Sequence, residues 1–109
     1  GKSMESDLFS VHFTPLAFED LDEIDSYLSD ALCNPQAAEK LLHEMQAAIN
    51  RLRTFPMSGS SVDDPYLAAK GYRKLVVQNY LVLHLIDQEQ HGVVIMRIVH
   101  GAREYHNLL

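Results

Sequence analysis

The sequence has 109 residues, a formal net charge of −6, and ordinary fractions of hydrophobic (47%) and charged (22%) residues. A chain of this length and balance can bury a core of its own, so we expect residues 1–109 to form a single domain, with Gly1-Lys2-Ser3 ahead of Met4 as a candidate expression remnant. The single Cys33 excludes an internal disulfide, and no apolar run approaches the roughly 20 residues that span a bilayer. No signal peptide opens the chain, so we expect a cytoplasmic protein with no membrane partner.

The charge is distributed unevenly along the chain. Residues 1–64 hold four Lys and Arg against twelve Asp and Glu, whereas residues 65–109 hold five against three. A protein that binds a polyanion over a large surface is usually basic overall, which this chain is not. Any anion-binding site must therefore be local, and it must lie in the second half of the chain.

The first half of the chain predicts one strand and a helical hairpin. Residues 8–13 alternate well enough for a short strand. Thr14-Pro15 and Asn34-Pro35 each combine a helix N-cap residue with proline at the first helical position. Apolar residues then recur at spacings of three and four, at Ala17, Leu21, Ile24, Leu28 and Leu32 in the first helix and at Ala38, Leu41, Met45, Ala48, Leu52 and Phe55 in the second. The acidic residues within 19–25 are expected to form a solvated face of the first helix.

A long loop and three strands follow the hairpin. Residues 55–59 end the second helix, and the stretch after them has no clear period, so we expect a loop to about Lys70 that is either functional or a plain connector. The predicted strands are Tyr72–Val77, Tyr80–Ile86 and Val93–His100. The second of these is apolar on both faces, which is typical of a central strand covered on both sides. The helical hairpin can cover one face of the sheet, so residues 102–109 or a partner protein must cover the other.

Four stretches of the chain carry a resemblance to a known family. They are AFEDLDEIDSYL (Ala17–Leu28), LRTFPMSG (Leu52–Gly59), GYRKLVVQNYLVLHLID (Gly71–Asp87) and VVIMRIVHGAREY (Val93–Tyr105). In this order they resemble the RelE/ParE family of bacterial type II toxin–antitoxin toxins, also called plasmid stabilisation proteins, over nearly the whole chain. The resemblance implies an α+β fold with a helical hairpin packed on a mainly antiparallel four-stranded sheet, in the order β-α-α-β-β-β-α. It also implies a hetero-oligomer with a cognate antitoxin, whose disordered or helical tail wraps the toxin and blocks its site.

The RelE-like branch of this family gives the main functional hypothesis, an mRNA interferase. Its members cut mRNA in the ribosomal A site and need no metal, and no His, Cys, Asp or Glu spacing here resembles a metal site, so we expect no cofactor. Such cleavage needs a base for the ribose 2′-OH, cations at the phosphate and a proton for the leaving oxygen. In this interpretation the catalytic residues are Arg97, His100, Arg103 and Tyr105, and the substrate-binding residues are Lys70, Arg73 and Lys74. Arg73 and Lys74 alternate along a strand, so at most one of them faces the site directly.

The ParE-like branch gives the alternative, because its members bind and poison DNA gyrase and are not nucleases. Two features favour this gyrase-inhibitor hypothesis: the acidic net charge, and the segment RIVHGARE (Arg97–Glu104), which resembles the end of the last strand in ParE-like sequences. A third hypothesis is a degenerate member that only binds its antitoxin.

Several candidate residues also have a structural interpretation. Arg97 lies on an otherwise apolar face and can instead pair with a carboxylate. His100 can be a hydrogen-bonded strand end, and His84, which lies among aliphatic residues, favours a satisfied core histidine. In a regular strand Arg97 and His100 point to opposite faces, so they cooperate only if the strand twists or breaks near Val99.

Overall fold

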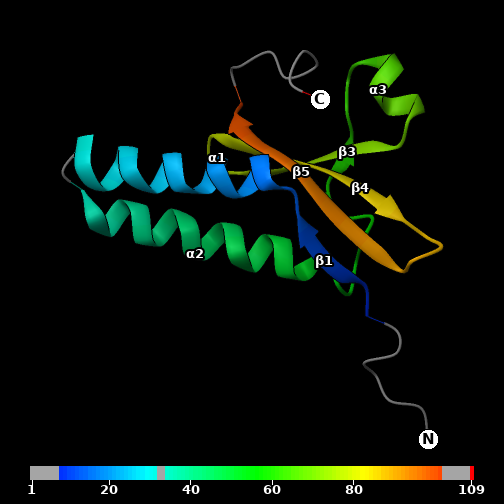
Figure 1. Ribbon diagram of the computed structural model, residues 1–109, viewed down its shortest axis with the longest axis horizontal. Helices are drawn as coiled ribbons and strands as arrows, with labels where there is room; N and C mark the ends of the chain where they lie inside the picture. Colours follow the sequence, from blue (N-terminus) through cyan, green and yellow to red (C-terminus); the bar gives the residue numbers. More distant parts are fainter. Residues whose placement is uncertain (1–7, 32–33, 102–108) are drawn as a thin grey trace, which may run out of the picture.

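The computed structural model describes residues 8–31, 34–101 and 109, and its elements largely follow the expected order (Figure 1). They are β1 (Ser10–Phe13), α1 (Pro15–Ser26), the π-helical turn η2 (Tyr27–Ala31), α2 (Pro35–Arg51), β2 (Ser60–Ser61), α3 (Pro65–Ala69), β3 (Tyr72–Val77), β4 (Tyr80–Asp87) and β5 (Gly92–His100). The last expected helix falls mainly on residues 102–108, which lie outside the described residues. In the described part of the chain, no helix is both long and apolar enough to cross a membrane.

The two long helices begin where the sequence predicts. Thr14 Oγ1 accepts a hydrogen bond from the Ala17 amide at 3.1 Å, and Asn34 Oδ1 accepts one from the Ala37 amide at 3.1 Å. Each cap is followed by proline at the first helical position, where a backbone N–H would have no hydrogen-bond acceptor within the helix. Figure 1 shows α1 and α2 side by side as the predicted hairpin.

The C-terminal ends of both helices differ from the prediction. α1 ends at Ser26 and is followed by a single π-helical turn to Ala31. α2 ends at Arg51, because the amides of residues 52–54 bond to carbonyls three residues back and tighten the last turn. The side chain of Phe55, predicted to continue the apolar face, is 62% exposed. That part of the prediction is wrong.

The sheet has five strands in the order β1-β5-β4-β3-β2. β1 pairs with β5 in parallel, and the other three pairs are antiparallel, so the sheet is mainly antiparallel as predicted. β4 is the central strand, which confirms the interpretation of its two apolar faces. The fifth strand is β2, a two-residue edge that the sequence analysis did not include.

Each face of the sheet carries its own apolar cluster. On the face of the helical hairpin, the cluster includes Ala17 of α1, Met45 of α2, and Val82 and Ile95 of the sheet. The opposite face carries a smaller cluster formed by Leu81, Leu83 and Val99 of the sheet with Val62 and Leu67, and the partly buried Ala68, Tyr72 and Leu109 pack against it. The second face is therefore partly covered from within the chain.

The long loop predicted to Lys70 is wrong, because it contains β2 and α3. Asp64 caps α3 by accepting hydrogen bonds from the amides of Tyr66 at 2.8 Å and Leu67 at 3.3 Å, and Pro65 follows it. This is the same cap-and-proline pattern that begins α1 and α2, but the helix has only five residues and shows no period. Leu67 of this helix is buried against the second face of the sheet.

Candidate functional site

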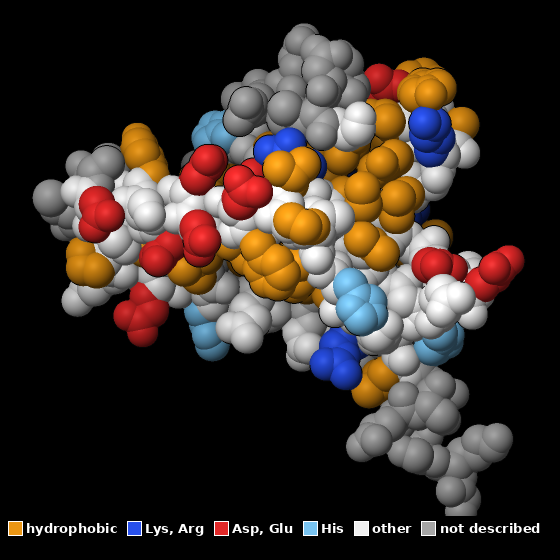
Figure 2. Space-filling view, viewed as in Figure 1, with side chains coloured by type: hydrophobic (Ala, Val, Ile, Leu, Met, Phe, Trp, Pro, Cys, Tyr) orange, Lys and Arg blue, Asp and Glu red, His pale blue; other side chains and the backbone are white. Residues whose placement is uncertain are grey.

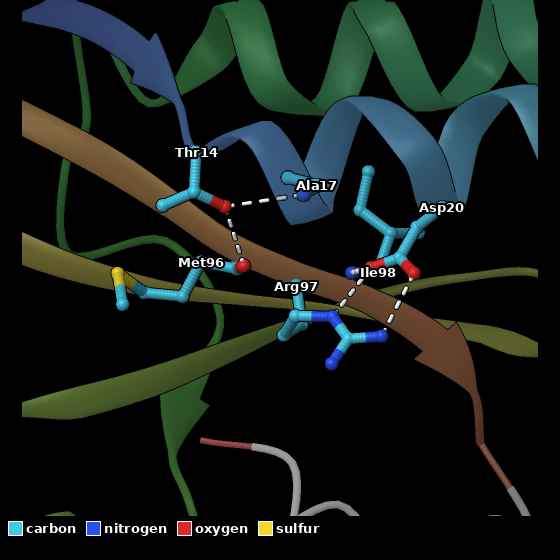
Figure 3. Close-up of polar contacts among 6 residues, drawn as sticks. All are labelled: Thr14, Ala17, Asp20, Met96, Arg97 and Ile98. Atoms are coloured by element: carbon cyan, nitrogen blue, oxygen red, sulfur yellow. Dashed lines mark hydrogen bonds and ion pairs between the residues drawn. The ribbon is translucent and has the colours of Figure 1, made fainter.

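Arg97 and His100 lie near the C-terminal end of β5, where this strand extends beyond its neighbour β1. β1 ends at Phe13, opposite Ile95, while β5 continues to His100. α1 then runs along the uncovered edge of β5. Thr14 donates its amide to the Ile95 carbonyl at 3.1 Å. Its hydroxyl donates to the Met96 carbonyl at 2.8 Å (Figure 3). The backbone and side chain of Thr14, the N-cap residue of α1, thus replace the bonds of a missing strand.

β5 is irregular at Met96. Leu83 of β4 faces Arg97, whereas the next residue, His84, faces Ile95, so Met96 is an extra residue on the β5 side. An extra residue of this kind bends a strand and redirects the side chains after it. The irregularity lies before Arg97 and not near Val99, where the sequence analysis required a break.

Asp20 is the centre of this junction. Its carboxylate accepts hydrogen bonds from Arg97 Nε at 2.8 Å and Nη2 at 2.9 Å, and from the Ile98 amide at 2.9 Å (Figure 3). The Asp20 side chain is 9% exposed and that of Arg97 is 15% exposed, so the pair is largely shielded from water. The hydrogen bonds to Asp20 raise the pKa of Arg97 above its ordinary value. This is a two-pronged ion pair, and it ties α1 to β5.

Sequence reasoning missed Asp20 by placing it on a solvated acidic face, and that prediction is wrong. A signal was present, because Asp20 lies three residues after Ala17 and four before Ile24, both buried. An acidic residue at a position on the apolar face of a helix indicates that its carboxylate pairs with a buried group. For Arg97, the structure shows an ion pair with a carboxylate, which is the structural interpretation given in the sequence analysis.

His100 lies on the other side of the strand from Arg97. It is exposed at the end of β5 and makes an edge-to-face contact with Tyr80, 5.5 Å between ring centroids at 78°. Tyr80 packs against the cluster on the hairpin face, whereas Leu83, the cross-strand neighbour of Arg97, belongs to the cluster on the opposite face. The structure therefore does not bring Arg97 and His100 together. The other two predicted catalytic residues, Arg103 and Tyr105, lie outside the described residues.

The three predicted substrate-binding cations are dispersed. Lys74 pairs with Asp63 at 3.2 Å, on the same face as Leu83. Arg73 points to the hairpin face, where its Nη2 donates to the carbonyls of Met57 at 2.8 Å and Gly59 at 3.4 Å. These two residues do alternate between faces, as predicted.

Lys70, the third of these cations, ends α3. Its Nζ lies 4.5 Å from the centre of the Tyr66 ring, and hydrogen bonding to Tyr66 raises the pKa of this exposed lysine. Lys74 and Arg97 share a face of the sheet, but the β4 strand separates them, which at strand spacing is roughly 10 Å. A catalytic or phosphate-binding role for any of these residues stays a prediction.

His84 is fully buried at the centre of the sheet, which confirms that it is a core histidine. Its Nδ1 lies 3.2 Å from the Val82 carbonyl, which can only accept, so we assign the ring proton to Nδ1. Burial lowers the pKa of His84, and the nearby charge of Arg73, its cross-strand neighbour, lowers it further. Within the described residues, His84 Nε2 and Arg73 Nε are buried and have no hydrogen-bond partner. The histidine is therefore neutral and only half satisfied.

Across residues 8–31, 34–101 and 109, no group of three or more His, Cys, Asp or Glu side chains could hold a metal ion.

Comparison with known proteins first defines the fold. The structure is similar to a chain of the chromosomal ParDE toxin–antitoxin system from P. aeruginosa, with a TM-score of 0.68 and 20% identity over 86% of this chain and 97% of that one. It is also similar to a chain of the toxin–antitoxin complex RelBE2 from Mycobacterium tuberculosis, with a TM-score of 0.60 and 23% identity over 94% of this chain and 100% of that one. The expected RelE/ParE-like fold is confirmed. No curated protein matches the chain.

The family follows from the sequence match. The model of the ParE toxin of type II toxin–antitoxin systems, parDE, matches residues 11–105. The chain therefore belongs to the ParE toxin family of type II toxin–antitoxin systems, as the sequence resemblance implied.

Proposed function

We propose that this toxin acts in the ParE manner, by binding and poisoning DNA gyrase without cleaving RNA, and that a cognate antitoxin binds and neutralises it. The match to the ParE family model supports the choice of branch. The two similar structures come from toxin–antitoxin systems, which supports the antitoxin partner. The target and the partner both act in the cytoplasm.

The observation that carries this choice is the pair between Asp20 and Arg97. A nuclease needs a cation that can bind the scissile phosphate, and the Nε–Nη2 edge of the Arg97 guanidinium is already held by a shielded carboxylate. Releasing Arg97 would leave Asp20 buried without its partner, and breaking a buried pair in this way costs about 3–5 kcal/mol. Arg97 is therefore better suited to hold the fold than to bind RNA.

The position of His100 supports the same choice. In-line cleavage requires the base and the cations to surround one phosphate. Arg97 and His100 leave β5 on opposite faces, and Arg73 and Lys74 leave β3 on opposite faces. An acidic chain is also poorly suited to docking on ribosomal RNA, whose phosphates repel it.

The test uses the purified protein with gyrase and, separately, induction in cells. We expect inhibition of supercoiling and trapped gyrase–DNA cleavage complexes at micromolar concentration, with messages that stay intact during growth arrest. His100→Ala should leave the gyrase effect in place. Cut mRNAs in ribosome complexes, lost in His100→Ala, would instead establish the ribosome-dependent mRNA cleavage of the RelE-like alternative.

A second experiment separates a toxin from a module that only binds its antitoxin. The chain is induced alone and then together with the product of the neighbouring reading frame. Growth arrest that the neighbour relieves is the expected result. Harmless expression of the chain alone would contradict the toxin function.

A further inference from the structure

A closed turn after α2 exposes two large apolar side chains. Phe55 is 62% exposed and Met57 is 58% exposed, with Pro56 between them. The Ser58 amide donates a hydrogen bond to the Phe55 carbonyl at 3.0 Å, which closes a four-residue turn with proline at its second position. We call residues 55–58 the apolar turn. Large apolar side chains that neighbour one another in water are a candidate interaction surface.

The backbone of the apolar turn is held in place although these side chains are exposed. Arg73 of β3 donates from Nη2 to the Met57 carbonyl at 2.8 Å and to the Gly59 carbonyl at 3.4 Å. Gly59 follows the turn at φ +86°, so close to β3 that a Cβ would overlap a carbonyl oxygen of that strand. The turn is therefore preorganised, and a partner that binds Phe55 and Met57 does not have to order the backbone.

The apolar turn follows a locally basic stretch of an acidic chain. Arg51 and Arg53 are exposed, and no Asp or Glu occurs from residue 51 to residue 62. The next two carboxylates along the chain pair with Lys74 and cap α3. Figure 2 shows acidic side chains spread over α1. The tip of the helical hairpin lies at the other end of the 17-residue α2, about 25 Å away, so the two ends of this helix differ in charge.

We propose that the apolar turn, with Arg51 and Arg53 beside it, is the surface by which this toxin docks on gyrase bound to DNA. The inference rests on the proposed function, and it adds the site, the orientation of the toxin and the chemistry of the surface that receives it. That surface is an apolar socket of the enzyme for Phe55 and Met57, close to the phosphates of the bound DNA.

The charge distribution selects this end of the toxin for a target that carries DNA. Duplex DNA has one negative charge per about 1.7 Å of its axis, and its field repels a protein of net charge −6. The repulsion is smallest when α1 points away from the DNA and the two arginines point toward it. In that orientation the apolar turn is presented to the enzyme.

A second copy of the chain fits this surface poorly. A two-fold contact places the same surface of both copies together. Arg51 and Arg53 of one copy would then face the same arginines of the other, and like charges across an interface oppose association. A complex that carries phosphates meets no such repulsion.

The test is a titration of gyrase supercoiling with the purified toxin and its variants. Phe55→Ala should raise the concentration for half inhibition about 30-fold or more, and Met57→Ala should raise it about 10-fold. Arg51→Gln/Arg53→Gln should raise it about 10-fold at low salt and less at high salt. Tyr66→Ala is the matched control, because it truncates an aromatic ring that is 67% exposed on α3, and it should stay within about twofold of the wild type.

Two further measurements make every outcome decisive. Thermal melting shows that the variants are folded, and calorimetry gives their affinity for the product of the neighbouring reading frame, which should stay within about twofold of the wild type. Full inhibition by Phe55→Ala and Met57→Ala would overturn the docking surface and leave the proposed function intact. Lost affinity for the neighbouring product, with inhibition unchanged, would overturn it in favour of the antitoxin. A wild-type dimer that Phe55→Ala dissociates, with inhibition unchanged, would overturn it in favour of self-association. If the wild type has no effect on gyrase, the proposed function itself fails, which distinguishes the two failures.

Discussion

Replacing Asp20 by alanine removes the group that ties α1 to β5. Three hydrogen bonds are lost, two from the Arg97 guanidinium and one from the Ile98 amide. The guanidinium stays largely shielded without a counter-charge, and the Ile98 amide loses its partner at a residue that is 3% exposed. Breaking a buried pair from one side costs about 3–5 kcal/mol, and we expect Asp20→Ala to lower the free energy of unfolding by that amount. In a domain of this size, each kcal/mol lowers the Tm by about 4 °C, so Tm should fall by about 12–20 °C.

A double-mutant cycle isolates the pair. Arg97→Ala alone leaves Asp20 without its cation, while Asp20→Ala/Arg97→Ala leaves neither charge stranded. The double variant should therefore be more stable than the sum of the single effects predicts, with a coupling energy of about 2–3 kcal/mol in urea unfolding. A loss below about 1 kcal/mol for Asp20→Ala, as for an exposed surface pair, would refute the reasoning, because water would then already screen the charges.

Three further predictions concern local structure and are measured by urea or thermal unfolding. Because burial lowers the pKa of His84 below 6.5, the unfolded chain takes up this proton first as the pH falls. The contribution of neutral His84 to the free energy of unfolding should therefore be lost from about pH 6.5 downward. His84→Leu should flatten this pH dependence of stability, and an unchanged slope would contradict the reasoning. Gly59→Ala should cost about 2 kcal/mol or more, because Gly59 has φ +86° and a Cβ would overlap a β3 carbonyl oxygen. Gly71→Ala should cost about 1 kcal/mol, because at φ +96° a Cβ would meet only Leu85 Cδ2, at an ordinary contact distance of 3.8 Å. Thr14→Val should cost about 1–2 kcal/mol, more than Asn34→Ala, because Thr14 both caps a helix and bonds to β5, and equal costs would show that the second bond contributes nothing.

Local signals predicted most of the fold. The starts of α1 and α2 follow from Thr14-Pro15 and Asn34-Pro35, and the central place of β4 follows from its two apolar faces. These features depend on neighbouring residues, so the sequence displays them directly. α3 carries the same type of cap at Asp64, but five residues are too few to show a helical period.

The candidate site could not be predicted in the same way, because its contacts are distant in sequence. Asp20 and Arg97 are 77 positions apart, and no pattern in the sequence predicts which carboxylate pairs with this arginine. The extra residue at Met96 depends on how β5 pairs with β4, and a strand pattern alone assumes regular pairing. The alternation that separates Arg97 from His100 was predictable, since it needs only the period of the strand.

α1 connects the junction at β5 with a groove beside α2, which is lined by Val11, Leu21, Leu42 and Met45 among others. Asp20 and Leu21 are adjacent, yet Asp20 bonds to β5 and Leu21 lines the groove, so one helix serves both surfaces. A protein that binds against α1 should hold this helix against β5 and suppress local opening of the junction. The Ile98 amide, whose partner is the Asp20 carboxylate, reports that opening directly. We expect its hydrogen exchange to slow at least about 10-fold when the product of the neighbouring reading frame binds, while Asp20→Asn, which weakens the junction, should bind that product less tightly. Exchange at Ile98 that is unchanged in the complex would mean that the two sides of α1 act independently.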